Sequence, residues 1–241
     1  MTGHLADRTW PELEAREPLV LLPLGACEQH GPHLPLDTDA AIATAVAERA
    51  LALLRSDTDV VLAPTQNYSA SGEHEGFPGT ISIGHTALHL LIVEIGRSML
   101  RWASRLVVVN GHGGNLNSLA GAVRRLRSEG RNVAWWPCAN GEPHAHSGRA
   151  ETSIVHALRP HAVRGAHLEP GPDAPAVLDQ LQTLGVKAVS PNGVLGNPAG
   201  ANGAEGAELL AKMSTALAAA VRGWQVDDTG RLLVAPKVGA P

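Results

Sequence analysis

The chain has 241 residues, of which 44% are hydrophobic and 17% are charged, and its formal net charge is -4. With 19 basic and 23 acidic residues and no basic run, it lacks the charge pattern of a protein that binds nucleic acid or an anionic membrane. The sequence contains no run of about 18 apolar residues, the length that spans a bilayer as a helix, and no apolar signal core lies near its start. We therefore expect a soluble cytoplasmic protein.

Short apolar runs alternate with longer amphipathic segments, which is typical of βαβ units around a mostly parallel sheet. This pattern predicts an α/β protein. Because no repeat or linker interrupts it, we expect a single domain over residues 1–241. A stretch at 190–203, rich in Gly, Pro and Asn, predicts a long loop that acts as a lid, an oligomer contact or a plain surface loop. The predicted elements are a strand at 19–24, a helix at 38–54, a strand at 60–63, a helix at 86–102, a strand at 106–109, a helix at 115–128, a strand at 132–136, a helix at 151–158, a strand at 186–189 and a helix at 204–224.

The densest polar cluster follows the first predicted strand. Glu28 and His30 are two residues apart, so their side chains leave an extended segment on the same side, and Asp39 follows in the first turn of the next helix. Open α/β sheets bind ligands at the carboxyl ends of their strands. A mixture of carboxylates and imidazole suits Zn, Fe or Mn and predicts a metal site. Taken alone, each residue is also typical of a polar loop or, for Asp37, of a helix N-cap.

Three further polar segments lie elsewhere in the chain. His112 sits in Asn-Gly-His-Gly-Gly-Asn directly after a predicted strand, where it can meet the first cluster and where glycines bring backbone amides close to an oxyanion. Glu151 opens a predicted helix, where its charge alone is favourable. Glu73 and His74 belong to a glycine-rich segment that we interpret as lining the substrate site. A serine hydrolase is disfavoured because the chain has no Gly-x-Ser-x-Gly elbow.

Four motifs in this order resemble the creatininase (creatinine amidohydrolase) family. The resemblance runs from about residue 19 to 160 and more loosely to 206. It implies a three-layer α/β/α fold, a centre of two divalent metal ions, hydrolysis of amide-type C–N bonds, and homo-oligomers that are often hexamers. The motifs are Glu-Gln-His-Gly-Pro-His-Leu-Pro-Leu-x-x-Asp at 28–39, Phe-Pro-Gly-Thr at 77–80, Asn-Gly-His-Gly-Gly-Asn at 110–115 and His-x-Gly-x-x-Glu-Thr-Ser at 146–153.

The resemblance implies roles for individual residues of the first and third motifs. Glu28, Asp39 and His112 correspond to the ligands of one metal ion. His30 and the shared Asp39 correspond to ligands of the second ion. The two ions would activate a water molecule that attacks the amide carbonyl. We therefore expect a hydrolase with a dinuclear metal centre.

The chain departs from creatininase directly after His112. Where creatininase continues with Tyr and Glu, this chain has two glycines, so one carboxylate ligand is missing, and we expect Glu151 to supply it. The departure also disfavours creatinine as the substrate. His146 aligns with the proton-handling histidine of the family, and an ordinary imidazole pKa near 6.5 suits protonation of the leaving nitrogen. We assign Glu73 and His74 to substrate positioning.

Three other stretches narrow the reaction within the family. Segments 34–39, 71–80 and 190–198 are most similar to its peptide-cleaving members, which implies release of a modified Val-Tyr-derived dipeptide from the C-terminus of a precursor peptide. A formamide hydrolase acting on formylaminopyrimidine-type or other small amides is the competing hypothesis. A catalytically silent binding or assembly subunit is a third, disfavoured because the chain keeps the candidate ligands together. These ligand types accept Zn, Fe or Mn, so the sequence does not identify the metal.

Overall fold

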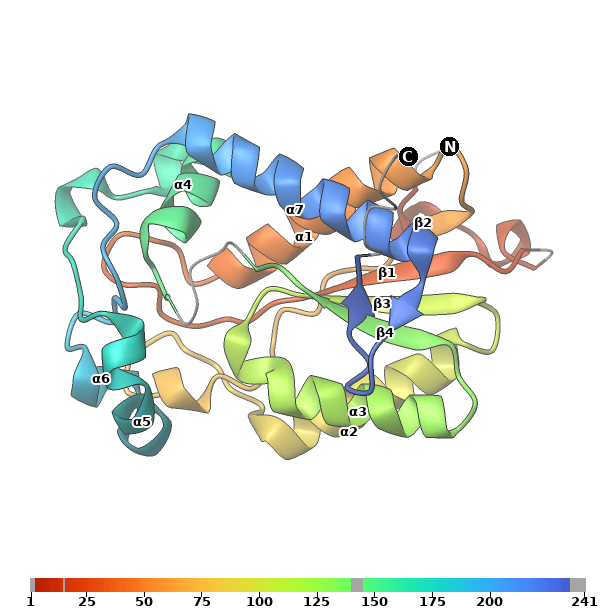
Figure 1. The fold of residues 1–241 in the computed structure, drawn as a ribbon, viewed down its shortest axis with the longest axis horizontal. Helices are drawn as coiled ribbons and strands as arrows, with labels where there is room; N and C mark the ends of the chain where they lie inside the picture. Colours follow the sequence, from red (N-terminus) through yellow and green to blue (C-terminus); the bar gives the residue numbers. More distant parts are fainter. Residues whose placement is uncertain (1–2, 15, 140–144, 235–241) are drawn as a thin grey trace, which may run out of the picture.

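The computed structural model describes residues 3–14, 16–139 and 145–234, so both ends of the predicted domain lie outside the described residues. Four parallel strands form the central sheet in the order β2-β1-β3-β4, and helices cover both of its faces (Figure 1). The predicted three-layer α/β/α fold is therefore confirmed. The strands of the sheet are β1 (Leu19–Leu24), β2 (Val60–Leu62), β3 (Arg105–Asn110) and β4 (Val133–Pro137), and a separate antiparallel hairpin contains β5 (Gln225–Val226) and β6 (Leu232–Leu233).

Each strand of the sheet sends alternate side chains into two hydrophobic layers. Leu19 and Leu21 face one layer, Val20 and Leu22 face the other, and all four are buried. Continuous apolar runs of this kind are expected for parallel strands that are covered on both sides. One helical layer consists of α1 (Thr38–Leu54), α4 (Arg149–Leu158) and α7 (Gly203–Gly223), and the other consists of α2 (Gly84–Met99) and α3 (Leu116–Ser128).

The strand order creates a switch point between β1 and β3. From β1 the chain crosses to β2 on one side, and from β2 it returns past β1 to β3 on the other side. The connections that follow β1 and β3 therefore diverge and leave a crevice at the carboxyl edge of the sheet. Leu24, the last residue of β1, is in register with Asn110, the last residue of β3. The loops that carry Glu28 and His112 thus begin side by side.

The end of the molecule beyond this edge differs from the sequence prediction. The predicted strand at 186–189 is wrong, because these residues form the short helix α6 (Val186–Val189). Its two valines are three residues apart, as suits one side of a helical turn, and Lys187 donates a hydrogen bond to the carbonyl oxygen of Gly76. Helix α5 (Ala174–Leu184) has no counterpart among the predicted elements. Both helices lie at the left end of Figure 1, apart from the sheet.

Contacts at the start of α1 bring Asp39 to the crevice. Asp37 occupies the N-cap position, but its carboxylate accepts two hydrogen bonds from Arg159, at 2.8 and 2.9 Å, and does not cap the helix. Asp37 therefore has the predicted position at the start of the helix, but the predicted hydrogen bond from its side chain to the helix backbone is absent. Gly111, after β3, allows the close approach of α1, since a Cβ there would lie only 2.4 Å from the carbonyl oxygen of Asp39.

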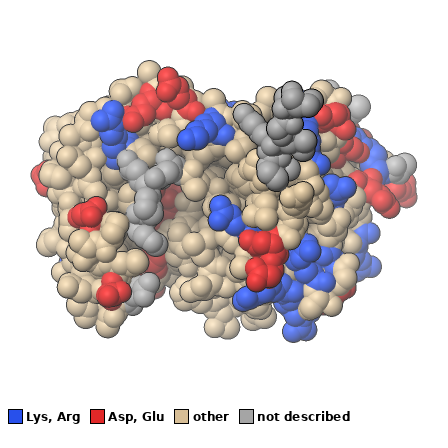
Figure 2. Space-filling model, viewed as in Figure 1, with Lys and Arg blue, Asp and Glu red and all other residues tan. Residues whose placement is uncertain are grey.

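Charged side chains of both signs are intermingled on the face shown in Figure 2, and much of the remaining surface of that face is uncharged. None of the helices in the described part of the chain has the length and apolarity that a membrane span requires. In contrast to these surface charges, one group of ionisable side chains lies inside the molecule. Its members are Glu28, His30, Asp39 and His112, and all four are buried at the carboxyl edge of the sheet.

Candidate metal centre

Two carboxylates and two imidazoles from three segments converge in the crevice between β1 and β3. Glu28 and His30 follow β1, Asp39 lies in the first turn of α1, and His112 follows β3; none of them is more than 5% exposed. His112 Nδ1 lies 3.2 Å from Glu28 Oε1 and 3.3 Å from Asp39 Oδ2. His30 Nε2 lies 3.1 Å from Asp39 Oδ1. Asp39 therefore directs one oxygen toward each imidazole.

Glu151 reaches the same centre from α4. Its carboxylate accepts a hydrogen bond from the backbone N–H of Ser147 at 2.6 Å and lies 4.0 Å from His30 Nε2. Among the described residues, three groups of side chains have ligand atoms within 4.8 Å of one another. These groups are Glu28 with Asp39 and His112, His30 with Asp39 and Glu151, and Glu28 with His30 and His146. The first two share Asp39. The first is the set predicted for one metal ion, and the second adds Glu151 to His30 and Asp39, the pair predicted for the other ion.

Three carboxylate oxygens of this centre lack a hydrogen-bond donor. Both oxygens of Glu28 and Oδ2 of Asp39 have no hydrogen-bond partner among the described residues. Burying such charges without partners costs several kcal/mol, on the order of the penalty for an unpaired buried ion. Ligand atoms about 2.1 Å from a tetrahedral ion are about 3.4 Å apart, which is close to the observed spacings of 3.1 to 3.3 Å. The donor set therefore fits divalent metal ions.

A backbone contact fixes the orientation of His30. Its Nδ1–H donates to the carbonyl oxygen of Glu28 at 3.1 Å, so Nε2 faces Asp39 and Glu151. Metal-binding histidines commonly donate their other N–H in this way. Burial disfavours the charge of His30, but the neighbouring carboxylates outweigh it and raise its pKa to about 9, while burial raises the pKa of Glu151 to about 7. Protons thus occupy the metal-free centre where cations would bind.

His74 and His146 border the centre on another side. His74 Nε2 lies 3.3 Å and His146 Nδ1 lies 3.8 Å from Glu28 Oε1. The Nε2–H of His146 donates to the backbone carbonyl of Gln29 at 2.7 Å, which leaves Nδ1 directed at the centre. Burial, and then the proximity of His30 and His74, lowers the pKa of His146 well below its ordinary value. Burial also lowers the pKa of His74, so both rings favour the neutral form.

Gln29 is a buried residue to which sequence reasoning assigns no function. Its side-chain Nε2 donates to His74 Nδ1 at 2.9 Å and to the carbonyl of Gly193 at 3.1 Å, while its backbone carbonyl accepts from His146 Nε2–H at 2.7 Å. The backbone N–H of Gly31 donates to its Oε1 at 2.8 Å. Gln29 therefore links both cavity-side imidazoles to a distant loop. The one sequence signal for this role is its place between two candidate ligands.

The predicted loop at 190–203 supports the site through its backbone. Leu195 and His146 exchange two backbone hydrogen bonds, at 2.8 and 3.0 Å. Val194 and Leu195 are both buried. The loop is therefore part of the wall that holds His146 and not a plain surface loop.

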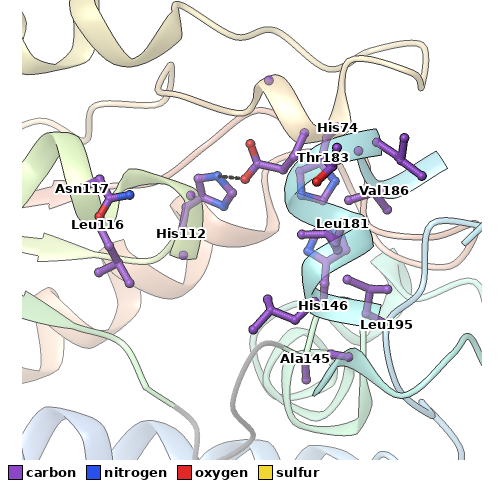
Figure 3. Close-up of a pocket in the computed structure, with 18 of the residues that line it drawn as sticks. His74, His112, Leu116, Asn117, Ala145, His146, Leu181, Thr183, Val186 and Leu195 are labelled. Atoms are coloured by element: carbon purple, nitrogen blue, oxygen red, sulfur yellow. Dashed lines mark ion pairs between the residues drawn. The ribbon is translucent and has the colours of Figure 1, made fainter. Parts of the chain in front are cut away.

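A cavity of about 900 Å³ opens beside the centre. In Figure 3, His112 lies on one side of it, and His74 and His146 lie on the other, next to Leu181 and Leu195. The sequence-predicted residue Glu73 also lines this cavity. The apolar part of the wall comes largely from α5 and α6, through Ala174, Leu178, Leu181, Leu184 and Val186.

Comparison with known proteins identifies the family. A sequence model of the creatininase family, described as creatinine amidohydrolase, matches residues 6–221. The chain belongs to the creatininase family. A mycofactocin precursor peptide peptidase from Mycolicibacterium smegmatis is 47% identical to it over 232 residues, which cover 95% of this chain and 94% of that protein. A protein of the same name from Mycobacterium tuberculosis is 46% identical over 242 residues and covers 96% of both chains.

More distant creatininases share the fold. A creatinine amidohydrolase from Pseudomonas putida is 32% identical over 192 residues, which cover 66% of this chain and 73% of that protein. A solved mutant creatininase superimposes with a TM-score of 0.79 at 26% identity and covers 93% of this chain and 99% of its own. Together with the carboxylate–imidazole groups, these matches confirm the predicted family and show a metal-dependent enzyme that acts on C–N amide bonds. They do not support the alternative of a catalytically silent subunit.

Proposed function

We propose that the chain is a peptidase that cleaves a mycofactocin precursor peptide near its C-terminus and releases a modified Val-Tyr-derived dipeptide. The observation that carries this proposal is the candidate metal centre at the side of a large cavity with an apolar wall. The name shared by the relatives at 46–47% identity supports the choice of substrate. A cavity of about 900 Å³ is also near the upper end of ligand sites and exceeds what a small formamide fills.

We assign two divalent metal ions, Zn, Fe or Mn, to the two groups that share Asp39. Glu28, Asp39 and His112 would hold one ion, and His30, Asp39 and Glu151 would hold the other. When bound, such ions polarise the scissile carbonyl and lower the pKa of a water molecule from about 15.7 toward 7. Both oxygens of Glu28 and Oδ2 of Asp39, which lack hydrogen-bond partners among the described residues, would supply the negative charge that holds the ions in this buried site.

His146 is the residue that we assign to proton transfer. Its Nδ1 faces the centre because the Gln29 carbonyl accepts its Nε2–H. The neutral ring can accept a proton from the attacking water and donate it to the leaving nitrogen, which cannot depart as an anion. His74, held by the Gln29 side chain on the same side of the cavity, is assigned to contact with the substrate.

An apolar stripe on α5 favours an apolar group of the substrate. Its residues recur every three or four positions and line the cavity, although Leu184 is 63% exposed. An exposed apolar stripe that faces a ligand cavity, and not the protein core, is typical of a binding surface. We infer that it contacts the valine- and tyrosine-derived groups beside the scissile bond. The residues of the stripe are Ala174, Leu178, Leu181 and Leu184.

Three properties of this enzyme rest on the sequence alone. The homo-oligomeric assembly, with a hexamer as the expected form, the cytoplasmic location and the single domain over 1–241 remain predictions. None of them is needed for the chemistry assigned above.

The proposed function is tested with purified protein, a precursor peptide that carries the modified C-terminus, and mass spectrometry. After incubation we expect the precursor to lose the mass of its modified C-terminal dipeptide. Removal of metal with a chelator should abolish this cleavage, and addition of Zn, Fe or Mn should restore it. His146→Ala should retain the metal content of the wild type and lose about 10²–10⁴-fold in turnover, the usual range for a general acid–base group.

A formamide substrate serves as the competing probe in the same assay. Hydrolysis of a formylaminopyrimidine with no cleavage of the peptide would replace the peptidase proposal with the formamide hydrolase. Turnover by His146→Ala at the wild-type rate would remove this histidine from the mechanism and leave the peptidase assignment intact.

A further inference from the structure

His112 presents its two ring nitrogens to different sets of acceptors. Nδ1 faces Glu28 and Asp39, the side on which the proposed ion would bind. Nε2, on the far side of the ring, lies 3.3 Å from Glu73 Oε1 and 3.1 Å from the carbonyl oxygen of Ala70. Because a metal-binding nitrogen carries no proton, the ring proton of His112 belongs on Nε2. The Nε2–H then donates to the carbonyl oxygen of Ala70, and Glu73 Oε1 lies beside it as a second, charged acceptor.

Glu73 comes from a different part of the chain than the ligands that it adjoins. It lies in a short 3-10 turn, Gly72–His74, between β2 and α2, and its side chain is 23% exposed at the cavity. The dashed line in Figure 3 marks its ion pair with His112. A carboxylate that accepts the second N–H of a metal-binding histidine holds the ring in place and makes it a stronger ligand. Charge-assisted bonds of this kind are stronger than a bond to a neutral carbonyl.

Gly114 provides the space that this contact needs. A Cβ at Gly114 would lie 2.2 Å from Glu73 Oε1 and 2.4 Å from His112 Nε2, distances that real Cβ atoms do not show. A side chain there would therefore push the carboxylate and the imidazole apart. The neighbouring Gly113 differs, because a Cβ at that position would meet nothing within 4 Å. Two adjacent glycines of one motif thus have different structural requirements.

We propose that Glu73 is a positioning residue that orients His112 through Nε2, and that Gly114 is required because it leaves room for this contact. The proposal rests on the proposed function in one respect, namely that His112 binds a metal ion. It assigns Glu73 to the ion held by Glu28, Asp39 and His112, and not to direct contact with the substrate. The proposal assigns Glu73 no role toward the second ion, at His30 and Glu151.

The test measures metal affinity by competition with a chelator, in the absence of substrate, for the wild type and for Glu73→Gln, Gly114→Ala and Gly113→Ala. We expect Glu73→Gln and Gly114→Ala each to lower the affinity for one of the two ions by about 10–100-fold, the usual effect of removing a hydrogen-bond partner of a metal-binding histidine. Gly113→Ala, the matched control, should bind both ions as the wild type does. The double variant Glu73→Gln/Gly114→Ala should be no weaker than the more affected single variant, because both changes break one contact.

The outcomes separate this inference from the proposed function. If the wild type binds no divalent ion, the proposed function fails. If the wild type binds two ions and Glu73→Gln binds both as tightly while its KM rises, Glu73 contacts the substrate and the inference is overturned. If Gly114→Ala does not fold, Glu73→Gln still decides the role of Glu73 because it keeps the size of the side chain. Equal losses in Gly113→Ala and Gly114→Ala would overturn the role of Gly114.

Discussion

The candidate metal centre and the α5–α6 segment border the same cavity, but they are built in opposite ways. Glu28, Asp39 and His112 are buried, and they lie in the loops that follow β1 and β3 or in the first turn of a long helix. Among the α5 side chains that the structure describes, by contrast, Ala174 alone is buried, and the stripe faces the cavity. The difference supports the proposed division of tasks, in which the sheet edge holds the reacting groups and α5 contacts the substrate.

Asp39→Asn should disrupt the candidate metal centre, and we expect it to have the largest effect of the three changes. The amide keeps the size of the side chain but removes the charge that both candidate metal groups share. We expect loss of both ions, with a fall in metal affinity of more than about 100-fold, since even an outer partner costs about 10–100-fold. Elemental analysis after dialysis measures the metal content. Asp37→Asn is the matched control, because that carboxylate pairs with Arg159 and should leave the metal content unchanged; full occupancy in Asp39→Asn would contradict the assignment.

Leu181→Ala tests the second region, the α5 wall of the cavity. Truncation of this cavity-facing leucine removes apolar contact with the peptide, so we expect KM to rise by about 5–30-fold, equivalent to about 1–2 kcal/mol, while kcat and metal content change little. Leu90→Ala, on the exposed surface of α2, is the control and should leave KM unchanged. Steady-state kinetics with the peptide substrate measure the difference. A fall in kcat at constant KM would place α5 in the chemistry and erase the division of tasks.

The pH dependence of the metal-free protein gives the smallest of the three effects. In the folded state the pKa of His30 is raised to about 9 and that of Glu151 to about 7, so the native state holds these protons more tightly than the unfolded chain. Their stabilisation is complete below the unfolded values, near 4.5 for Glu151 and 6.5 for His30, and it is lost as pH rises through the folded values. We expect the Tm of the metal-free protein to fall between pH 6.5 and 9, by about 2–4 °C for each kcal/mol lost.

Metal loading should remove this decline, because metal binding requires deprotonated imidazoles and tightens as pH rises. Differential scanning calorimetry of both forms across this range measures the effect. Leu181→Ala should show the same decline as the wild type, since α5 contributes none of the groups concerned. A metal-free Tm that stays level from pH 6.5 to 9 would argue against the buried proton sites.

The sequence predicts the metal centre better than the cavity wall, for a physical reason. Apolar runs such as Leu19–Leu24 are buried on both sides, and parallel strands end at a common edge, so the convergence of Glu28 and His112 follows from local patterns. Helix α5 does carry apolar residues every three or four positions, but this periodicity does not tell whether the stripe faces a cavity or the core. Pro175 in its first turn also favours a helix start there.

Other features depend on contacts that no local pattern encodes. The four residues Val186–Val189 are too few to distinguish a strand from a helical turn by periodicity. The links from Gln29 to His74 and His146 join segments that lie more than forty residues apart in the chain. The overlap between Glu73 and the space beside Gly114 likewise appears only when two separate loops are folded together.

The paired backbone bonds between Leu195 and His146 join two parts of the cavity wall that are far apart in the sequence. Both residues line the cavity, so a change in the backbone of the 190–203 loop at Leu195 would also move the backbone that carries the His146 imidazole. The loop therefore bears on the geometry of proton transfer as well as on the shape of the cavity.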